Sequence, residues 1–167
     1  TDAGGFYGPI ADLPLAGAPV VVVGTGGAAH AVLFALSRVG AGPVTLLARN
    51  PLKGAALLAR FGLKGDVRPI ESAIPPAQLL VNTTSLGMVG QPAFAPDLSP
   101  LPEDALVYDI VYAPLMTPLL QAADARDLQI VDGLDMLVGQ AAIAFELFFG
   151  AAPPRDRDEE LRERLLA

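Results

Sequence analysis

Short runs of apolar residues alternate along the chain with longer stretches in which apolar positions recur every three or four residues. The runs with the length and composition of buried strands are 20–23, 44–48, 66–70, 79–82, 106–110 and 129–131. Helical spacing is found at 28–39, 51–61 and 117–126. Because strands and helices that alternate in this way build a parallel sheet covered on both faces, we predict an α/β fold. It would be a three-layer, Rossmann-like, doubly wound and mostly parallel sheet of about six strands, followed by C-terminal helices.

Local signals predict two helix starts and one long loop. Asn50 precedes Pro51 and Thr117 precedes Pro118, so that a capping side chain stands before a proline in the first helical turn. The Gly- and Pro-rich segment 83–102 follows a predicted strand at its carboxyl end. Open α/β sheets bind ligands at that edge, so this loop is expected to carry function.

Two further helices are predicted after the last strand. Residues 135–149 are strongly apolar, whereas 155–166 are charged and amphipathic. We expect the second helix to present a solvated face rather than a partner site.

The composition excludes several classes of function. The net charge of −7 argues against nucleic acid or an anionic membrane as the main partner, because both require a basic face. The absence of cysteine and the single histidine exclude disulfides, thiolate sites and a histidine metal cluster, and no metal site is predicted. The apolar stretch 136–149 is too short to span a bilayer, and the N-terminus has no signal-peptide pattern. We therefore expect a cytoplasmic protein, whose start at Thr1 rather than methionine suggests the removal of a preceding segment.

Residues 24–29 read Gly-Thr-Gly-Gly-Ala-Ala and lie between a predicted strand and a predicted helix. This order matches the dinucleotide-binding fingerprint G-x-G-x-x-G/A, with Ala29 in the third small position. Gly24 would permit the tight turn, Gly26 would let a pyrophosphate approach the backbone, and the phosphates would lie at the helix N-terminus. A glycine turn with only a packing role remains the alternative.

The residues after the second strand indicate which nucleotide is preferred. NAD is normally selected there by an acidic side chain that binds the ribose 2′-hydroxyl. This chain has Arg49, with Lys53 one helical turn further on, and that pair suits a 2′-phosphate. NADP is therefore predicted rather than NAD, with an ordinary exposed Arg–Lys pair at a helix start as the alternative reading.

Six segments spread along the chain form an ordered set of motifs. They are Thr1-Asp2-Ala3-Gly4-Gly5-Phe6, the 24–29 turn, Arg49-Asn50, Val81-Asn82-Thr83-Thr84-Ser85-Leu86-Gly87-Met88, Asp109-Ile110-Val111-Tyr112-Ala113-Pro114 with Thr117-Pro118-Leu119-Leu120, and Asp132-Gly133-Leu134 through Met136-Leu137-Val138 to Gln140-Ala141-Ala142. Together they resemble the C-terminal, NADP-binding part of shikimate dehydrogenase, and the resemblance extends through most of the chain.

The resemblance implies hydride transfer from NADPH to the ring carbonyl of 3-dehydroshikimate, which gives shikimate for aromatic amino-acid synthesis. A Lys–Asp pair passes the proton in that family, and the motif match makes Asp2 its aspartate. Substrate contacts are implied for Thr1, Asp2, Tyr112 and Gln140. Cofactor contacts are implied for Gly24, Thr25, Gly26, Gly27, Ala28, Arg49, Asn50, Lys53, Asn82, Thr83, Thr84, Ser85, Met88, Gly133 and Met136. From the residues alone, Asp2 reads as a helix N-cap, Gln140 as a buried amide and Tyr112 as a packing residue.

The chain departs from the family pattern in three respects. The family's catalytic lysine belongs to an N-terminal substrate domain, and neither Lys53 nor Lys64 lies in its motif. Asp135 stands where the family usually has glycine, which weakens the implied contacts of 133–136. His30 replaces a residue that is often arginine or serine and is expected to be a surface residue.

The expected organisation follows from the same resemblance. Residues 1–16 would be a helix or linker from the missing substrate domain, 17–134 the NADP-binding domain, and 135–167 helices that pack back toward the substrate cleft. The expected partners are NADP(H), shikimate or 3-dehydroshikimate, and either the missing domain or a second copy of the chain. The chain alone would bind NADP and be largely inactive. A paralogue acting on quinate and a non-catalytic NADP-binding module remain as alternatives.

Overall fold

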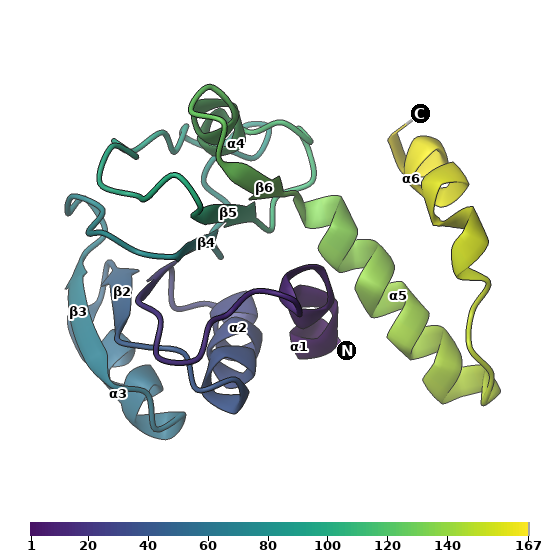
Figure 1. Ribbon diagram of the computed structural model, residues 1–167, viewed down its shortest axis with the longest axis horizontal. Helices are drawn as coiled ribbons and strands as arrows, with labels where there is room; N and C mark the ends of the chain where they lie inside the picture. Colours follow the sequence, from purple (N-terminus) through teal and green to yellow (C-terminus); the bar gives the residue numbers. More distant parts are fainter. Residues whose placement is uncertain (167) are drawn as a thin grey trace.

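The computed structural model describes residues 1–166 and places the predicted strands in one parallel sheet (Figure 1). The spatial order is β3-β2-β1-β4-β5-β6. The strands are β1 (Val20–Val23), β2 (Val44–Ala48), β3 (Gly65–Pro69), β4 (Leu79–Asn82), β5 (Leu106–Asp109) and β6 (Gln129–Val131). Val22 pairs with Leu46 on one side and with Val81 on the other, so β1 occupies the centre. The predicted doubly wound α/β fold is confirmed.

The helices connect and cover this sheet. They are α1 (Asp2–Tyr7), α2 (Gly27–Arg38), α3 (Pro51–Arg60), α4 (Pro118–Asp124), α5 (Gly133–Phe149) and α6 (Asp158–Leu166), with 3₁₀ turns η1 (Gly8–Ile10) and η2 (Arg155–Arg157). In Figure 1, α5 runs outward from the end of β6, and α6 returns beside it. No helix in the described part of the chain is long and apolar enough to cross a membrane.

Side-chain alternation along the strands divides the core into two layers. Val20 and Val22 face α1, α2 and α3, where they meet Phe6 and Leu33. Residues of the opposite parity, such as Val21, face α4 and the loop 83–102. The central strands are buried on both faces, which explains why they read as continuous apolar runs. By contrast, β3 is an edge strand with exposed polar residues, and it gives the weakest sequence signal.

Both predicted proline-containing helix starts are confirmed. The Asn50 side chain accepts a hydrogen bond from Lys53 N at 3.1 Å, and the Thr117 hydroxyl accepts one from Leu120 N at 3.3 Å. A prediction from the residues alone was wrong at the N-terminus: Asp2 is the first residue of α1, and Thr1 is its N-cap.

Other predicted ends moved for local reasons. The helix predicted at 135–149 begins two residues earlier, because the Asp132 side chain accepts hydrogen bonds from Leu134 N and Asp135 N and caps it. The charged helix predicted at 155–166 divides into η2 and α6. The remaining differences are of one or two residues, which is the usual spread of helix and strand ends.

Candidate functional site

The sheet reverses its strand order between β1 and β4, and the predicted nucleotide turn lies at that point. Gly24 follows β1, and its N–H donates to Leu47 O at 2.8 Å. Thr83 follows β4 and donates to Val23 O from both its backbone nitrogen, at 2.9 Å, and its hydroxyl, at 2.6 Å. Ligands of open α/β sheets bind where the carboxyl ends of the strands diverge in this way. The fold therefore places the fingerprint and the start of the long loop side by side.

The turn requires glycine at its first position for two independent reasons. Gly24 has φ = 105°, a conformation that side-chain-bearing residues rarely adopt. A Cβ there would also lie 2.7 Å from Thr84 Cγ2 and 2.8 Å from Thr83 Oγ1. At Gly26 and Gly27 a Cβ would meet nothing within 4 Å, so the backbone at the start of α2 borders open space. A phosphate could approach the unpaired N–H groups of this helix end.

Two consecutive residues in the first turn of α2, Ala29 and His30, differ in burial. Ala29 is fully buried, as expected for a small residue that brings α2 close to the sheet. His30 is half-buried rather than a free surface residue, because its ring packs edge-on against Phe61 with centroids 6.2 Å apart. Its Nδ1 lies 2.9 Å from Gly26 O, a geometry that braces the turn.

A groove of about 600 Å³ opens beside the end of β2. It lies between Arg49, the Ile70–Ser72 segment after β3, and the loop that begins at Thr84 and Ser85. The Arg49 side chain is exposed and contributes a positive charge to the groove. Lys53 is exposed and does not line the groove, so Arg49 is the cation that lines it. Glu71 also lines the groove; no local sequence signal pointed to it.

Asn82, a predicted cofactor-binding residue, has a fully buried side chain. Its Nδ2 donates to Asp109 Oδ1 at 2.9 Å and to Leu86 O at 3.1 Å, while its Oδ1 accepts from Thr84 N and Thr84 Oγ1. The other Asp109 oxygen accepts from Thr117 Oγ1 at 2.7 Å. These contacts were not found from sequence, since Asn82 and Asp109 are 27 residues apart.

Burial raises the pKa of the Asp109 carboxyl above its usual range, and hydrogen bonds from Thr117, Val111 N and Asn82 offset part of the rise. In the unfolded chain this group ionises near pH 4. Between about pH 4 and the higher folded pKa, the folded protein binds more protons than the unfolded chain, so the free energy of unfolding must fall as pH rises.

We therefore expect the stability difference between the wild type and Asp109→Asn to shrink as pH rises above about 4, and to level off above the folded pKa. Urea unfolding of both proteins across a pH series measures this difference, and the contributions of other titrating groups cancel in it. A difference that is constant with pH would contradict the raised pKa.

The first and fifth helices meet closely, which brings together residues from the two ends of the chain. A Cβ on Gly5 would lie 2.6 Å from Gln140 Cγ and 2.7 Å from Met136 O. Asp2, at the exposed start of α1, is therefore held on the helix that packs against Gln140. Gln140 is only half-buried, so the buried-amide reading of this residue does not hold in full.

The predicted substrate residue Tyr112 follows β5 and is 51% exposed, which does not fit a packing role. Its segment is tied to the long loop, because Val89 N donates to Ala113 O at 3.0 Å. The structure thus links the segment that carries Tyr112 to the long loop, and the helix that carries Asp2 to the helix that carries Gln140.

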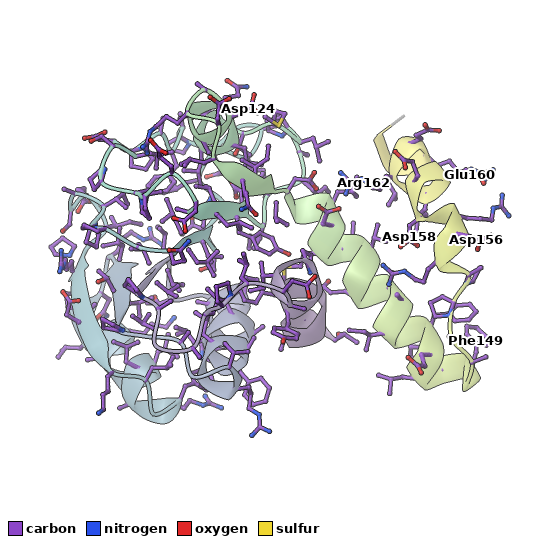
Figure 2. The ribbon with its side chains drawn as sticks, in the orientation of Figure 1. Asp124, Phe149, Asp156, Asp158, Glu160 and Arg162 are labelled. Atoms are coloured by element: carbon purple, nitrogen blue, oxygen red, sulfur yellow. The ribbon has the colours of Figure 1, made fainter. Side chains whose placement is uncertain are left out.

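The start of α5 is tightly enclosed. A Cβ on Gly133 would lie 2.1 Å from Ile110 O, and the Met136 side chain is 5% exposed in the core. Asp135 pairs with Arg162 of α6, and Arg162 also pairs with Asp132 at 2.7 Å. Figure 2 shows Arg162 between α6 and the start of α5. The helix expected to present a solvated face is therefore tied to the start of α5 through Arg162.

A fully buried tyrosine lies behind this helix start. Tyr108 stacks on Phe6 with ring centroids 5.0 Å apart, and its hydroxyl has no hydrogen-bond partner among the described residues. Burial and the carboxylates of Asp135 and Asp132 raise its pKa, so the phenol stays protonated. Its position in an apolar strand gave no sequence signal beyond packing.

Comparison with known proteins matches residues 133–161 to the family model described as the shikimate 5′-dehydrogenase C-terminal domain. The chain is 65% identical over 167 residues to shikimate dehydrogenase (NADP(+)) of Sphingopyxis alaskensis, an alignment that covers 100% of this chain and 61% of the relative. The chain thus spans about three fifths of that relative's length.

Two solved structures share the fold. One is shikimate 5-dehydrogenase from Thermus thermophilus in complex with NADP(H) and shikimate, with a TM-score of 0.78 and 37% identity over 98% of this chain and 61% of that chain. The other is quinate dehydrogenase from Corynebacterium glutamicum in complex with NAD, with a TM-score of 0.79 and 33% identity over 99% of this chain and 61% of that chain.

Proposed function

We propose that this chain, which is similar to shikimate dehydrogenases over its whole length, is the NADP-binding portion of an enzyme that reduces 3-dehydroshikimate to shikimate. One observation carries the cofactor part of this proposal. The Gly24 turn and the Arg49 groove both border the point where the strand order reverses. The first offers backbone N–H groups and the second a cation, which together fit a dinucleotide with an additional phosphate.

The residues of this site fit NADP(H) in the following way. The backbone of Gly24, Thr25, Gly26, Gly27 and Ala28 would hold the pyrophosphate at the start of α2. Arg49 would hold the 2′-phosphate, and Lys53 would add positive charge from outside the groove. Asn50 is engaged as the cap of α3, so its part in binding is to orient the helix that follows Arg49. When bound, the cofactor supplies the hydride.

The loop after β4 would form the wall near the nicotinamide half, with Thr83, Thr84, Ser85 and Met88 on it. Gly133 and Met136 would close this wall from α5. Because the Asn82 side chain is buried, it would act on the cofactor through this loop rather than by touching it.

Substrate contacts are proposed for Thr1, Asp2, Tyr112 and Gln140. All but Gln140 are exposed, and Gln140 is half-buried against α1. Asp2 would orient a substrate hydroxyl and support the charge of a lysine that moves the proton. The chain's two lysines, Lys53 and Lys64, do not follow the family's lysine motif. A positioned acid or base contributes about a hundred- to ten-thousandfold in rate, so this chain alone would bind NADP and turn over little substrate.

We propose that residues 1–16 connect to a substrate-binding domain, that 17–134 bind the cofactor, and that 135–167 pack toward the cleft between the two. The aromatic end of α5 supports a contact there, since Phe148 is 84% and Phe149 71% exposed. Figure 2 shows Phe149 at the end of α5 that lies away from the sheet. A second copy of the chain is the other candidate for this contact. Such a biosynthetic dehydrogenase would work in the cytoplasm.

A quinate-type specificity is the second candidate function. It is favoured by the likeness to quinate dehydrogenase, whose TM-score of 0.79 is close to the 0.78 of the Thermus thermophilus shikimate enzyme. Assays of the full-length protein with shikimate and quinate would separate the two substrates.

Calorimetric titration of the chain with NADP⁺ and with NAD⁺ tests the cofactor proposal. We expect NADP⁺ to bind at least about tenfold more tightly, a difference of roughly 1.4 kcal/mol. Equal affinities would remove the 2′-phosphate role of Arg49, and no binding of either nucleotide would contradict the assignment of a working cofactor site to this chain.

A further inference from the structure

The Asp109 carboxylate joins three separate segments at the carboxyl edge of the sheet. It is fully buried at the end of β5. Its Oδ1 accepts from Asn82 Nδ2 at 2.9 Å and from Val111 N at 3.1 Å, and its Oδ2 accepts from Thr117 Oγ1 at 2.7 Å. A carboxylate can accept on both oxygens at once, which an amide or a hydroxyl of the same size cannot do.

Asn82 passes this constraint to the long loop. Its amide makes four hydrogen bonds, two as donor and two as acceptor. Because the Thr84 backbone nitrogen can only donate, the Asn82 oxygen must face Thr84, and the Asn82 nitrogen must then face Asp109. Thr84 Oγ1 in turn accepts from Leu86 N at 3.1 Å. The conformation of residues 84–86 therefore depends on the acceptor at position 109.

The same carboxylate also shapes the segment on the other side of the site. Val111 N is bonded to Asp109, and Tyr112 follows directly. The Val111 carbonyl accepts from Gly133 N at 3.3 Å, at the start of α5. Thr117, the third donor to Asp109, caps α4.

We propose that Asp109 is a positioning residue that sets both walls of the site, acting through Asn82 on the cofactor-side loop and through Val111 and Thr117 on the Tyr112 segment. This inference rests on the proposed function, because it takes the loop after β4 as a wall of the cofactor site. Asp109 itself has no exposed surface, so it would act through these neighbours and not by contact with a ligand.

Thr117→Val tests the inference, because it removes the hydroxyl donor to Asp109 while keeping the shape of the side chain. Thr117→Ser is the matched control that keeps the hydroxyl, and Val107→Ala truncates a buried β5 residue that lies outside this hydrogen-bond network. Should Thr117→Val fail to fold, Asp109→Asn takes its place, since it keeps one acceptor oxygen and loses the other. Two quantities are measured for each variant of the chain: the NADP⁺ dissociation constant, and the amide hydrogen exchange of Thr84, Leu86 and Val111 without nucleotide.

We expect Thr117→Val to weaken NADP⁺ binding by about two- to tenfold, because the variant loses the hydrogen bond to Asp109 and also the capping bond from Leu120 N. Exchange at the three amides should accelerate relative to amides of β1, and Thr117→Ser should restore both quantities. Val107→Ala should lower stability and leave the dissociation constant within about twofold. Unchanged binding and exchange in Thr117→Val, or equal losses in Val107→Ala, would overturn the positioning role. If the wild-type chain binds no NADP⁺, the proposed function fails, and the exchange comparison alone decides the role of Asp109.

Discussion

Replacement of Gly133 by alanine is expected to destabilise the fold more than any other single-methyl change in the site. The added Cβ would lie 2.1 Å from Ile110 O, 2.5 Å from Ile110 C and 2.6 Å from Val111 C. These are backbone atoms of the segment that follows β5, so they cannot rotate away as a side chain could. Either α5 or the segment carrying Tyr112 must move, and we expect a loss of about 3 kcal/mol in the free energy of unfolding, the upper end of the usual cost of overpacking.

Urea unfolding of the Gly133→Ala variant measures this loss, with Gly8→Ala as its matched control. Gly8 has helical backbone angles of −47° and −55°, and a Cβ there would meet nothing within 4 Å. The control should be as stable as the wild type, or more stable by about 0.4–1 kcal/mol, because alanine restricts the unfolded chain. A Gly133→Ala protein within about 1 kcal/mol of the wild type would show that the helix start can shift at little cost.

Arg49→Ala is expected to have the largest effect on nucleotide choice. A hydrogen bond to a charged group contributes about 1.5–3 kcal/mol, so loss of this guanidinium should weaken NADP⁺ binding by about ten- to a hundredfold. NAD⁺, which has no 2′-phosphate, should bind within about threefold of its affinity for the wild type. Lys53→Ala should cost much less, because Lys53 lies outside the groove that Arg49 lines.

Calorimetric titration with both nucleotides separates these effects. Arg60→Ala is the control, since Arg60 is also exposed and is the last residue of α3, the helix that begins just after Arg49 and Asn50. It removes the same charge from the protein and should change neither affinity appreciably. A parallel loss of NADP⁺ and NAD⁺ binding in Arg49→Ala would assign Arg49 to the shared part of the cofactor and not to the 2′-phosphate.

The reliability of each sequence-based prediction depended on how local its physical cause was. The ends of β1, β2 and β4 were predicted to the residue, because an almost continuous apolar run between turn residues reports burial on both faces. The ends of β6 were also predicted to the residue, although β6 is only partly buried. The caps at Asn50 and Thr117 involve atoms three residues apart, so they too could be read directly. The edge strand β3 gave a weak signal, since its exposed residues carry no such pattern.

What the sequence did not reveal concerned contacts between distant segments. The cofactor contact of Asn82 stays a prediction, but its hydrogen bonds to Asp109 and Thr84 inside the protein were not expected. The charged C-terminal helix was expected to present a solvated face, yet its Arg162 pairs with Asp132 across 30 residues. In both cases the residue type was informative, but the identity of its partner depended on how two elements meet in space.

The sequence alone was sufficient for the α/β sheet and for the glycine turn after β1, because each follows from a periodicity or from neighbours within one turn. The nucleotide-binding roles of that turn and of Arg49 stay predictions. Only the tertiary structure brought Gly5 against Gln140, separated Lys53 from the Arg49 groove, and joined β4 to β5 through Asp109. Those contacts depend on the strand order and on helix packing, which determine the distance between residues that are far apart in the chain. Different strand orders and helix packings are compatible with the same local pattern of polar and apolar positions, so that pattern does not predict these contacts.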